Sequence, residues 1–138
     1  MEVVQWESKY ETGVEDIDLQ HHYFLNLINH IIEAIMKREE KLYVEALVSE
    51  LEAYARFHFK SEERMMVKSG YPEYEQHKNH HFDLIQRLGI EQYKLLNMDE
   101  EGNAAEVMEF LISWFLEHTT KEDRCFADYL KTRGDLGA

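Results

Sequence analysis

The chain has 138 residues and a formal net charge of −13, with 28 acidic and 15 basic side chains. This charge disfavours binding to nucleic acid or to an anionic membrane surface, because no basic patch offsets the repulsion. The sequence has no apolar run of about 18 residues and no apolar leader, so we expect neither a membrane span nor secretion. One cysteine fits a reducing cytoplasm, and the length suits a single domain over residues 1–138. Eight histidines beside one proline and six glycines indicate a helical chain rich in metal-ligand side chains.

The N-terminal segment differs in pattern from the rest of the chain. Residues 1–17 lack a clear apolar period, which predicts an irregular arm whose aromatic side chains cover one end of the fold. A helical pattern begins at about Asp18, the predicted N-cap. Its apolar stripe consists of Phe24, Leu25, Ile28, Ile31, Ile32 and Ile35. His21 lies on this stripe and is expected to face the core, whereas His22 and His30 lie off it and are expected at the surface.

The second predicted helix covers about residues 42–67 and ends at Gly70, a glycine C-cap followed closely by the only proline. Its inward stripe consists of Leu47, Leu51, Tyr54, His58, Glu62 and Met65. His58 and Glu62 are four residues apart, so they lie one above the other on an otherwise apolar face. Because an unpaired charge in a core is costly, this pair must hydrogen-bond to itself or bind a further group.

The third predicted helix starts near Glu73 and carries His77 and His81 on one face. Two histidines at positions i and i+4 can bind one metal ion from a single helix face. His80, three residues after His77, is an alternative partner, but His81 better continues the leucine stripe of the helix.

The fourth predicted helix follows a loop over residues 98–102, where Asn103 resembles the first residue of a capping box. It continues to His118, after which a regular helix would place Glu122 on the same face. The apolar residues beyond keep better phase with Asp123. We therefore predict about one extra residue between His118 and Asp123, supplied by a π-bulge or by local unwinding, features that recur at functional sites.

Four amphipathic segments joined by short connections predict an all-α fold, an up-down-up-down antiparallel four-helix bundle. Each helix turns ligand-type side chains inward. The seven candidate metal ligands are His21, His58, Glu62, His77, His81, His118 and Asp123. They are too many for one zinc ion and suit two metals bridged by carboxylates. Imidazole and carboxylate without thiolate favour iron, followed by manganese or zinc.

The motifs that carry these ligands also resemble a known family. They are Asp18-Leu19-Gln20-His21, His58-x3-Glu62-Glu63, His77-x3-His81 and His118-x4-Asp123. In order and spacing they resemble the four signatures of the hemerythrin family, in its single-domain bacteriohemerythrin form. The resemblance implies His77, His81 and His118 on one iron, His21 and His58 on the other, and Glu62, Asp123 and an oxo or hydroxo group as bridges.

The resemblance also implies a function, which is reversible binding of dioxygen at the iron with fewer histidines, for storage, delivery or sensing, without enzymatic turnover. Nitric oxide and small anions are further candidate ligands of that open position. Such a site needs a dry pocket, and the candidate lining residues are Phe24, Leu25, Phe59, Leu111, Trp114 and Phe115.

Two other functions stay open at this point: a di-iron oxidase or peroxidase, and a sensor of oxygen, nitric oxide or iron that acts through a partner protein. Ferritin-like di-iron enzymes carry Glu-x-x-His pairs. No histidine of this chain has a glutamate three residues before it, which counts against that fold family.

Overall fold

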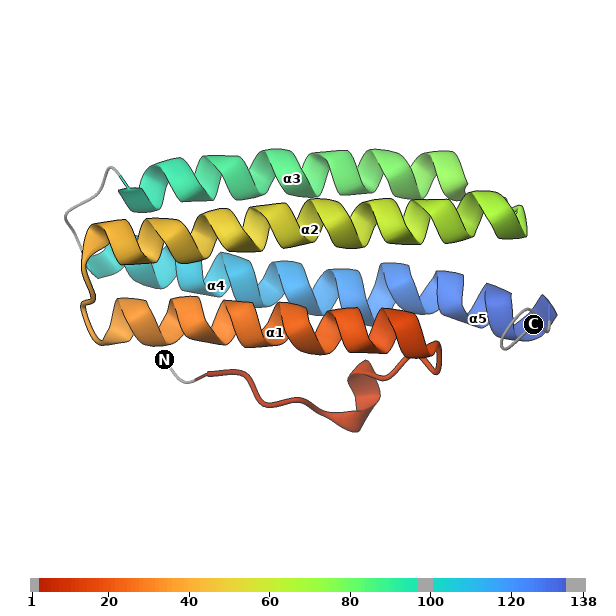
Figure 1. Ribbon diagram of the computed structural model, residues 1–138, viewed down its shortest axis with the longest axis horizontal. Coiled ribbons are helices and arrows are strands. Elements are labelled where there is room, and N and C mark those ends of the chain that lie inside the picture. The colour runs from red at the N-terminus through yellow and green to blue at the C-terminus, as the bar shows by residue number, and fades with distance from the viewer. Residues whose placement is uncertain (1–2, 97–100, 134–138) are drawn as a thin grey trace.

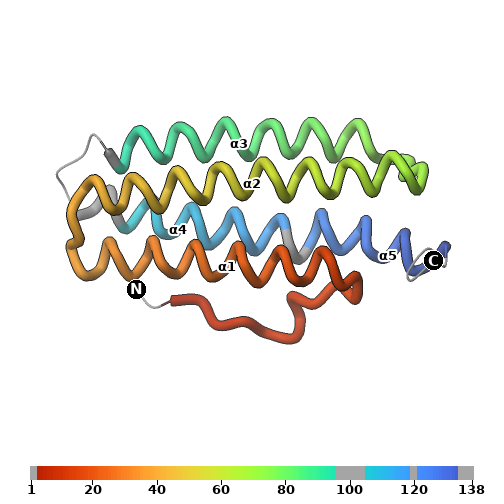
Figure 2. The backbone as a smooth tube through the Cα atoms, viewed as in Figure 1, coloured from red at the N-terminus to blue at the C-terminus, as the bar shows by residue number. Residues whose placement is uncertain are grey.

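The computed structural model describes residues 3–96 and 101–133, and the regular structure in these ranges is entirely helical (Figure 1). The long helices are α1 (Glu15–Met36), α2 (Lys41–Ser69), α3 (Tyr74–Leu96), α4 (Glu101–Glu117) and α5 (Asp123–Arg133). A π-helical turn, η2 (His118–Glu122), joins α4 and α5 into one continuous fourth rod (Figure 2). Helices α1 and α3 each pack against both α2 and α4. The predicted antiparallel four-helix bundle is confirmed.

The N-terminal arm runs along the side of α1 and includes a short 3-10 turn, η1 (Ser8–Tyr10) (Figure 1). The Val4 backbone N–H donates to Asn29 Oδ1 at 2.8 Å, and the Asn29 amide donates back to the Val4 carbonyl at 2.8 Å. Asn29 lies well along α1. The expectation that the arm covers one end of the bundle is therefore wrong, because these contacts hold it against the helix side.

Helix α1 begins at Glu15, so the prediction of Asp18 as its N-cap is wrong. The Asp18 carboxylate instead accepts hydrogen bonds from the Thr12 backbone N–H at 2.8 Å, the Thr12 hydroxyl at 2.7 Å and the Gly13 N–H at 3.1 Å. Gly13 has φ of 89°, a left-handed conformation that glycine adopts at low cost. Burial raises the pKa of Asp18 and these hydrogen bonds lower it, with a net downward shift. Asp18 thus fixes the turn between arm and helix from inside the first helical turn.

The end of α2 at Gly70 agrees with the prediction, but the methionine that faces the core in its last turns is not the predicted one. Gly70 has φ of 69° and follows the last helical residue, while the Tyr71 N–H donates back to the Met66 carbonyl at 3.0 Å. This is the hydrogen-bond pattern of a glycine-terminated helix. Met66 is fully buried, whereas Met65, predicted for the inward stripe, is half-buried. Met66 lies four residues after Glu62, and that spacing keeps it on the inward face.

Helix α4 starts at Glu101, two residues before the predicted cap at Asn103. The capping-box prediction is therefore wrong, and residues 101 and 102 of the predicted loop are helical. Residues 98–100 of that loop lie outside the described residues.

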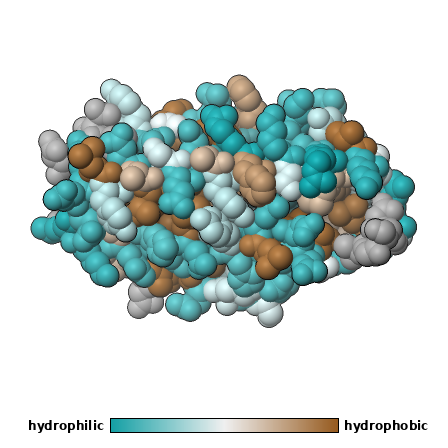
Figure 3. Space-filling view, in the orientation of Figure 1, coloured by the Kyte–Doolittle hydropathy of each residue, from teal (hydrophilic) through white to brown (hydrophobic). Residues whose placement is uncertain are grey.

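Buried apolar residues form two clusters along the bundle axis. The larger cluster contains Ile28, Leu51 and Leu88, and the smaller cluster contains Ile17, Met66 and Phe126. On each helix the candidate ligands fall between residues of the two clusters, so a polar layer separates them. Hydrophilic side chains cover most of the face seen in Figure 3. Among the described helices, none combines the length and apolar character that crossing a membrane requires.

Candidate metal centre

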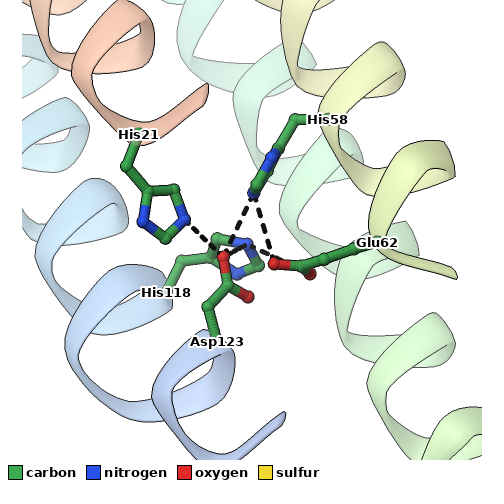
Figure 4. A group of neighbouring side chains, drawn as sticks. All are labelled: His21, His58, Glu62, His118 and Asp123. Atoms are coloured by element: carbon green, nitrogen blue, oxygen red, sulfur yellow. Dashed lines mark hydrogen bonds and ion pairs between the residues drawn. The ribbon is translucent and has the colours of Figure 1, made fainter. Parts of the chain in front are cut away.

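The polar layer brings together side chains from all four rods of the bundle. Its members are His21 of α1, His58 and Glu62 of α2, His77 and His81 of α3, His118 of η2 and Asp123 of α5. Each is 4% exposed or less. Figure 4 shows five of them, His21, His58, Glu62, His118 and Asp123, pointing toward one another across the bundle. All seven sequence-predicted ligand positions therefore meet in one buried layer.

The π-helical turn is what brings the fourth rod into this layer. Residues 118–122 are π-helical, as predicted from the phase of the sequence. The wider turn places His118 and Asp123, five residues apart, on one face, and both are buried. Glu122 is half-buried and belongs to neither of the two possible ligand groups described below.

Glu62 divides its two carboxylate oxygens between histidines of different helices. Its Oε2 lies 3.5 Å from His58 Nε2 on its own helix. Its Oε1 lies 3.1 Å from His81 Nε2 and 3.3 Å from His77 Nε2 on α3. A carboxylate that presents one oxygen to each set of imidazoles has the arrangement of a bridge.

Asp123 repeats this division from the opposite rod. Its Oδ2 lies 2.5 Å from His21 Nε2, 3.1 Å from His58 Nε2 and 2.9 Å from His118 Nε2. Its Oδ1 lies 3.4 Å from His77 Nε2. The two carboxylates together therefore contact all five imidazoles, and Figure 4 shows three of these rings, His21, His58 and His118, around the carboxylates.

Within the layer, the possible ligand atoms fall into two overlapping groups. One consists of His21, His58, Glu62, His118 and Asp123, and the other of His77, His81, His118 and Asp123. The ligand atoms of each group lie within 4.8 Å of one another. His118 and Asp123 belong to both, so the geometry accommodates two neighbouring cations and leaves His118 between them.

Several buried atoms of this layer have no hydrogen-bond partner among the described residues. Besides His21 Nδ1 and His118 Nδ1, which belong to rings whose Nε2 atoms contact Asp123, they are both carboxylate oxygens of Glu62, Asp123 Oδ1, and the Nε2 atoms of His77, His81 and His118. Leaving one buried polar group unpaired costs about 1–3 kcal/mol. Metal ions would satisfy these atoms together, and an imidazole–carboxylate set without thiolate suits iron, manganese or zinc. The residues present therefore fit a metal centre.

The layer also perturbs the titration of its members. Burial lowers the pKa of His77, but the adjacent carboxylates of Asp123 and Glu62, at 3.4 and 3.3 Å from Nε2, outweigh it and raise the pKa to about 10. Burial lowers the pKa of His118 to about 4, despite the neighbouring Asp123. The pKa of Asp123 is held well below its usual value, because the histidines around it outweigh its burial. Without a metal, the His77 imidazole therefore carries a proton at neutral pH, and its positive charge offsets part of the negative charge of the two carboxylates.

Two of the candidate ligand histidines are oriented by partners on their other ring nitrogen. His58 Nδ1 donates to Gln20 Oε1 at 2.6 Å, and the Gln20 amide donates to Ser61 Oγ at 3.2 Å. His81 Nδ1 donates to Glu63 Oε2 at 2.8 Å. Such contacts fix the tautomer that leaves Nε2 available to a metal.

Sequence reasoning gave Gln20 and Glu63 no role, although both stand in the ligand motifs. Each is the immediate neighbour of a ligand residue, His21 or Glu62. Successive helical residues diverge by about 100°. A polar side chain beside a ligand therefore turns toward the adjacent helix, and this is the signal that could have identified them.

Aromatic rings cover the histidines on the side of the larger apolar cluster. Phe59 stacks on His81 with ring centroids 4.0 Å apart and planes 8° apart. Phe24 lies 5.2 Å from the His58 ring, and Phe115 lies 6.3 Å from the His21 ring.

The other three candidate lining residues lie further back. Trp114 contacts the rings of Phe24 and Phe59 at 5.3 and 6.2 Å. Leu25 and Leu111 are buried in the same apolar cluster.

The remaining histidines lie outside the ligand groups. His22 and His30 are exposed, as predicted. His80 is half-buried, with its ring 6.2 Å from the His118 ring. It belongs to neither ligand group.

Comparison with known proteins places the chain among metal-binding proteins. The family described as "Hemerythrin HHE cation binding domain" matches residues 12–130. The chain is 29% identical over 129 residues to a bacteriohemerythrin of Clostridium acetobutylicum, covering 89% of this chain and 98% of that protein. It is 28% identical over 131 residues to a bacteriohemerythrin of Stenotrophomonas maltophilia, covering 95% of this chain and 84% of that protein.

A comparison of structures agrees at the level of the fold. The crystal structure of a hemerythrin point mutant has a TM-score of 0.80 to this chain and 23% sequence identity, and the match covers 93% of this chain and 97% of that one. The family match spans most of the sequence and includes every residue of the buried polar layer. The chain is a member of the hemerythrin family.

Proposed function

We propose that the chain forms a single domain over residues 1–138 that binds two iron ions and uses them to bind dioxygen reversibly. The observation that carries this proposal is the buried layer in which five imidazoles surround two carboxylates, with unpaired atoms directed inward. The bacteriohemerythrin names of the relatives support iron and dioxygen as the metal and the ligand.

The proposed ligand assignment follows the division of the two carboxylates. Glu62 and Asp123 each present oxygens to two sides, so they are the proposed bridges. His21 and His58 are the proposed terminal ligands of one iron, and His77, His81 and His118 those of the other. His118 contacts both sides, because its Nε2 lies 2.9 Å from Asp123 Oδ2, which also meets His21 and His58, and 3.9 Å from Glu62 Oε1, which also meets His77 and His81. Its proposed place beside His77 and His81 therefore rests on the family resemblance.

The unequal numbers of histidines suggest where a small ligand binds. The iron with two terminal histidines has fewer protein ligands and is the proposed site of dioxygen, and of nitric oxide or small anions. When bound, the iron pair supplies the electrons that dioxygen takes up.

The residues around the proposed site are suited to keeping it dry. Phe24 and Phe115 approach His58 and His21, the terminal ligands of that iron. Both rings are buried, at 1% and 3% exposure. Excluding water and free protons favours release of the bound ligand over its reduction, which supports a carrier rather than an enzyme.

An optical experiment tests the proposal. Protein loaded anaerobically with iron should be colourless, gain a charge-transfer band on exposure to air and lose it again under argon over repeated cycles. Irreversible oxidation in the first cycle, with peroxide released, would favour the oxidase or peroxidase reading instead. Glu122→Gln provides a matched control, because Glu122 neighbours Asp123 and belongs to neither ligand group.

A further inference from the structure

Helix α3 contains a glycine, Gly89, that the fold of a single chain does not require. Gly89 lies in the interior of the helix, and its φ is not positive, so a side chain would cause no backbone strain. Apart from the adjacent helix backbone, a Cβ atom on Gly89 would meet no heavy atom of the described residues within 4 Å. Glycine is less stable than alanine in a helix interior. Gly89 therefore lowers the stability of α3 without making room for any contact inside the chain.

The missing side chain lies in a groove on the outward surface of α3, which runs along one edge of the bundle (Figure 1). The groove has a volume of about 570 Å³. On α3 it is lined by Ile85, Gln86, Ile90 and Tyr93 around Gly89. Ile90 is 56% exposed and Tyr93 is 70% exposed. Two large side chains with apolar surface therefore stand in solvent beside the position that has no side chain.

The outward surface of α3 has the residue spacing of a helix-pairing seam. Phe82, Gln86, Gly89 and Tyr93 are four, three and four residues apart. This spacing places them on one stripe, as in the seam between two paired helices. Phe82 is 64% exposed, whereas the candidate metal ligands of α3 are buried on the other side of the helix. Helix α3 therefore carries a second seam, which the described residues leave largely in solvent.

This seam is complementary to itself when two copies of α3 run antiparallel about a two-fold axis. In such a pair each residue faces the residue at an equal distance beyond the axis. With the axis midway between residues 87 and 88, the facing pairs are Phe82 with Tyr93, Ile85 with Ile90, and Gln86 with Gly89. Aromatic residues thus meet aromatic residues, and isoleucine meets isoleucine. The long side chain of Gln86 meets the position that has none, so the two helices can approach closely.

The charge at the groove is compatible with a second copy of this acidic chain. The net charge of −13 makes two copies repel each other. The charged residues that line the groove are one acid, Glu52, and two bases, Arg56 and Lys94. A second copy therefore meets less repulsion at this groove than the net charge of the chain implies.

We propose that two copies of the chain associate through the outward surfaces of α3 in antiparallel orientation, with Gln86 of each copy seated over Gly89 of the other. The seam extends over about 17 Å of helix. This contact is too short to bury the roughly 1,200–2,000 Å² of a stable interface, so the dimer is weak and depends on protein concentration. The inference goes beyond the proposed function and does not depend on which metal the chain binds.

Sedimentation velocity at protein concentrations from micromolar to millimolar tests the dimer, with the full chain and the same metal content in every variant. Wild type should shift from monomer to dimer as its concentration rises. Gly89→Glu should stay monomeric, because the new side chain fills the groove and adds a carboxylate from each copy near the axis. Asn26→Glu is the matched control, because it adds the same charge at an exposed position of α1, and it should dimerise as wild type does.

The melting temperature, measured where wild type is monomeric, separates loss of the dimer from loss of folding. Glutamate is a better helix former than glycine. Since the single chain has room at this position, Gly89→Glu should melt no lower than wild type while it loses the dimer.

Two substitutions on the seam test its antiparallel register. Phe82→Lys alone and Tyr93→Glu alone should each weaken dimerisation about tenfold or more, because each removes an aromatic contact and places an unpaired charge in the interface. Both substitutions in one chain should restore part of the affinity, because each lysine then faces a glutamate of the other copy. The two positions are about 17 Å apart along one helix, so they cannot pair within a chain.

The outcomes that overturn the proposal are distinct. A wild-type chain that stays monomeric at every concentration would overturn it, as would a dimer that persists in Gly89→Glu or disappears in Asn26→Glu. A double variant that dimerises no better than the two single variants would overturn the antiparallel register. A lower melting temperature of monomeric Gly89→Glu would show that the single chain needs the glycine, and would remove the reason for the dimer.

Discussion

Replacing Glu63 by glutamine should weaken iron binding without disturbing the ligands themselves. Glu63 Oε2 accepts the His81 Nδ1–H at 2.8 Å, and its side chain is 15% exposed. Burial lowers the pKa of His81, and the adjacent Glu62 carboxylate together with the hydrogen bond to Glu63 outweighs it, so the net shift is upward. A carboxylate in this position increases the basicity of the imidazole toward a metal.

The size of the effect follows from how such outer contacts behave in other metal sites. Their loss costs about 10- to 100-fold in metal affinity. That is about 1.4–2.7 kcal/mol of binding free energy. Glu63→Gln keeps the hydrogen bond and loses only the charge, so we place it near tenfold. Glu63→Ala loses both and is placed near 100-fold.

Anaerobic titration with ferrous iron against a competing chelator measures these affinities. Glu50→Gln is the matched control, because Glu50 lies on the same helix and contacts Tyr23 instead of a ligand. The reasoning fails if Glu63→Gln and Glu63→Ala both bind iron as tightly as wild type and Glu50→Gln. It also fails if Gln20→Glu, which adds a carboxylate beside His58, weakens binding as much as Glu63→Ala.

Three further predictions follow from the titrating groups and from the π-helical turn. Because the pKa of His77 is raised to about 10, metal binding at pH 7 should release at least one proton per chain, measured by calorimetry in buffers of different ionisation enthalpy. A raised pKa stabilises the folded, metal-free protein below the unfolded value of about 6.5, and this contribution is lost as pH rises toward about 10. The melting temperature of metal-free wild type should therefore fall across that interval relative to His77→Gln; parallel curves would contradict the assignment. Asp123→Ala should abolish the di-iron spectrum and Glu122→Ala should preserve it, because the π-helical turn directs Asp123 into the layer. The reverse result would mean that Glu122, not Asp123, is the metal ligand.

The helical rods and the ligand layer were predictable because local periodicity determines both. In α2, His58 and Glu62 follow the same four-residue spacing as the apolar positions around them. The π-helical turn was predictable for the same reason, since Phe126 and Leu130 keep phase with Asp123 rather than with Glu122. A π-helical turn inside a continuous helix shifts the apolar spacing by one residue. The shift is visible in the sequence because the buried face must be apolar both before and after the turn.

Features that depend on contacts between rods were not predictable in this way. Gln20 and Glu63 act across helix boundaries, and their partners are fixed by how α1, α2 and α3 pack. The Asp18 carboxylate accepts hydrogen bonds as an N-cap would, but from inside the helix and toward Thr12. The path of the arm depends on the pairing of Val4 with Asn29, 25 residues away in the chain. None of these contacts leaves a periodic signal.

Anomalous X-ray diffraction from iron-loaded crystals, recorded at the iron absorption edge, tests the central claim most directly. Two peaks are expected inside the bundle, one beside His21 and His58 and the other beside His77 and His81, with Glu62 and Asp123 contacting both. His118 belongs to both ligand groups, so its distances to the two peaks show which iron it binds. The proposal requires the peak beside His77 and His81 to be the nearer one. A single peak, or two peaks outside the layer of buried histidines, would contradict the di-iron centre.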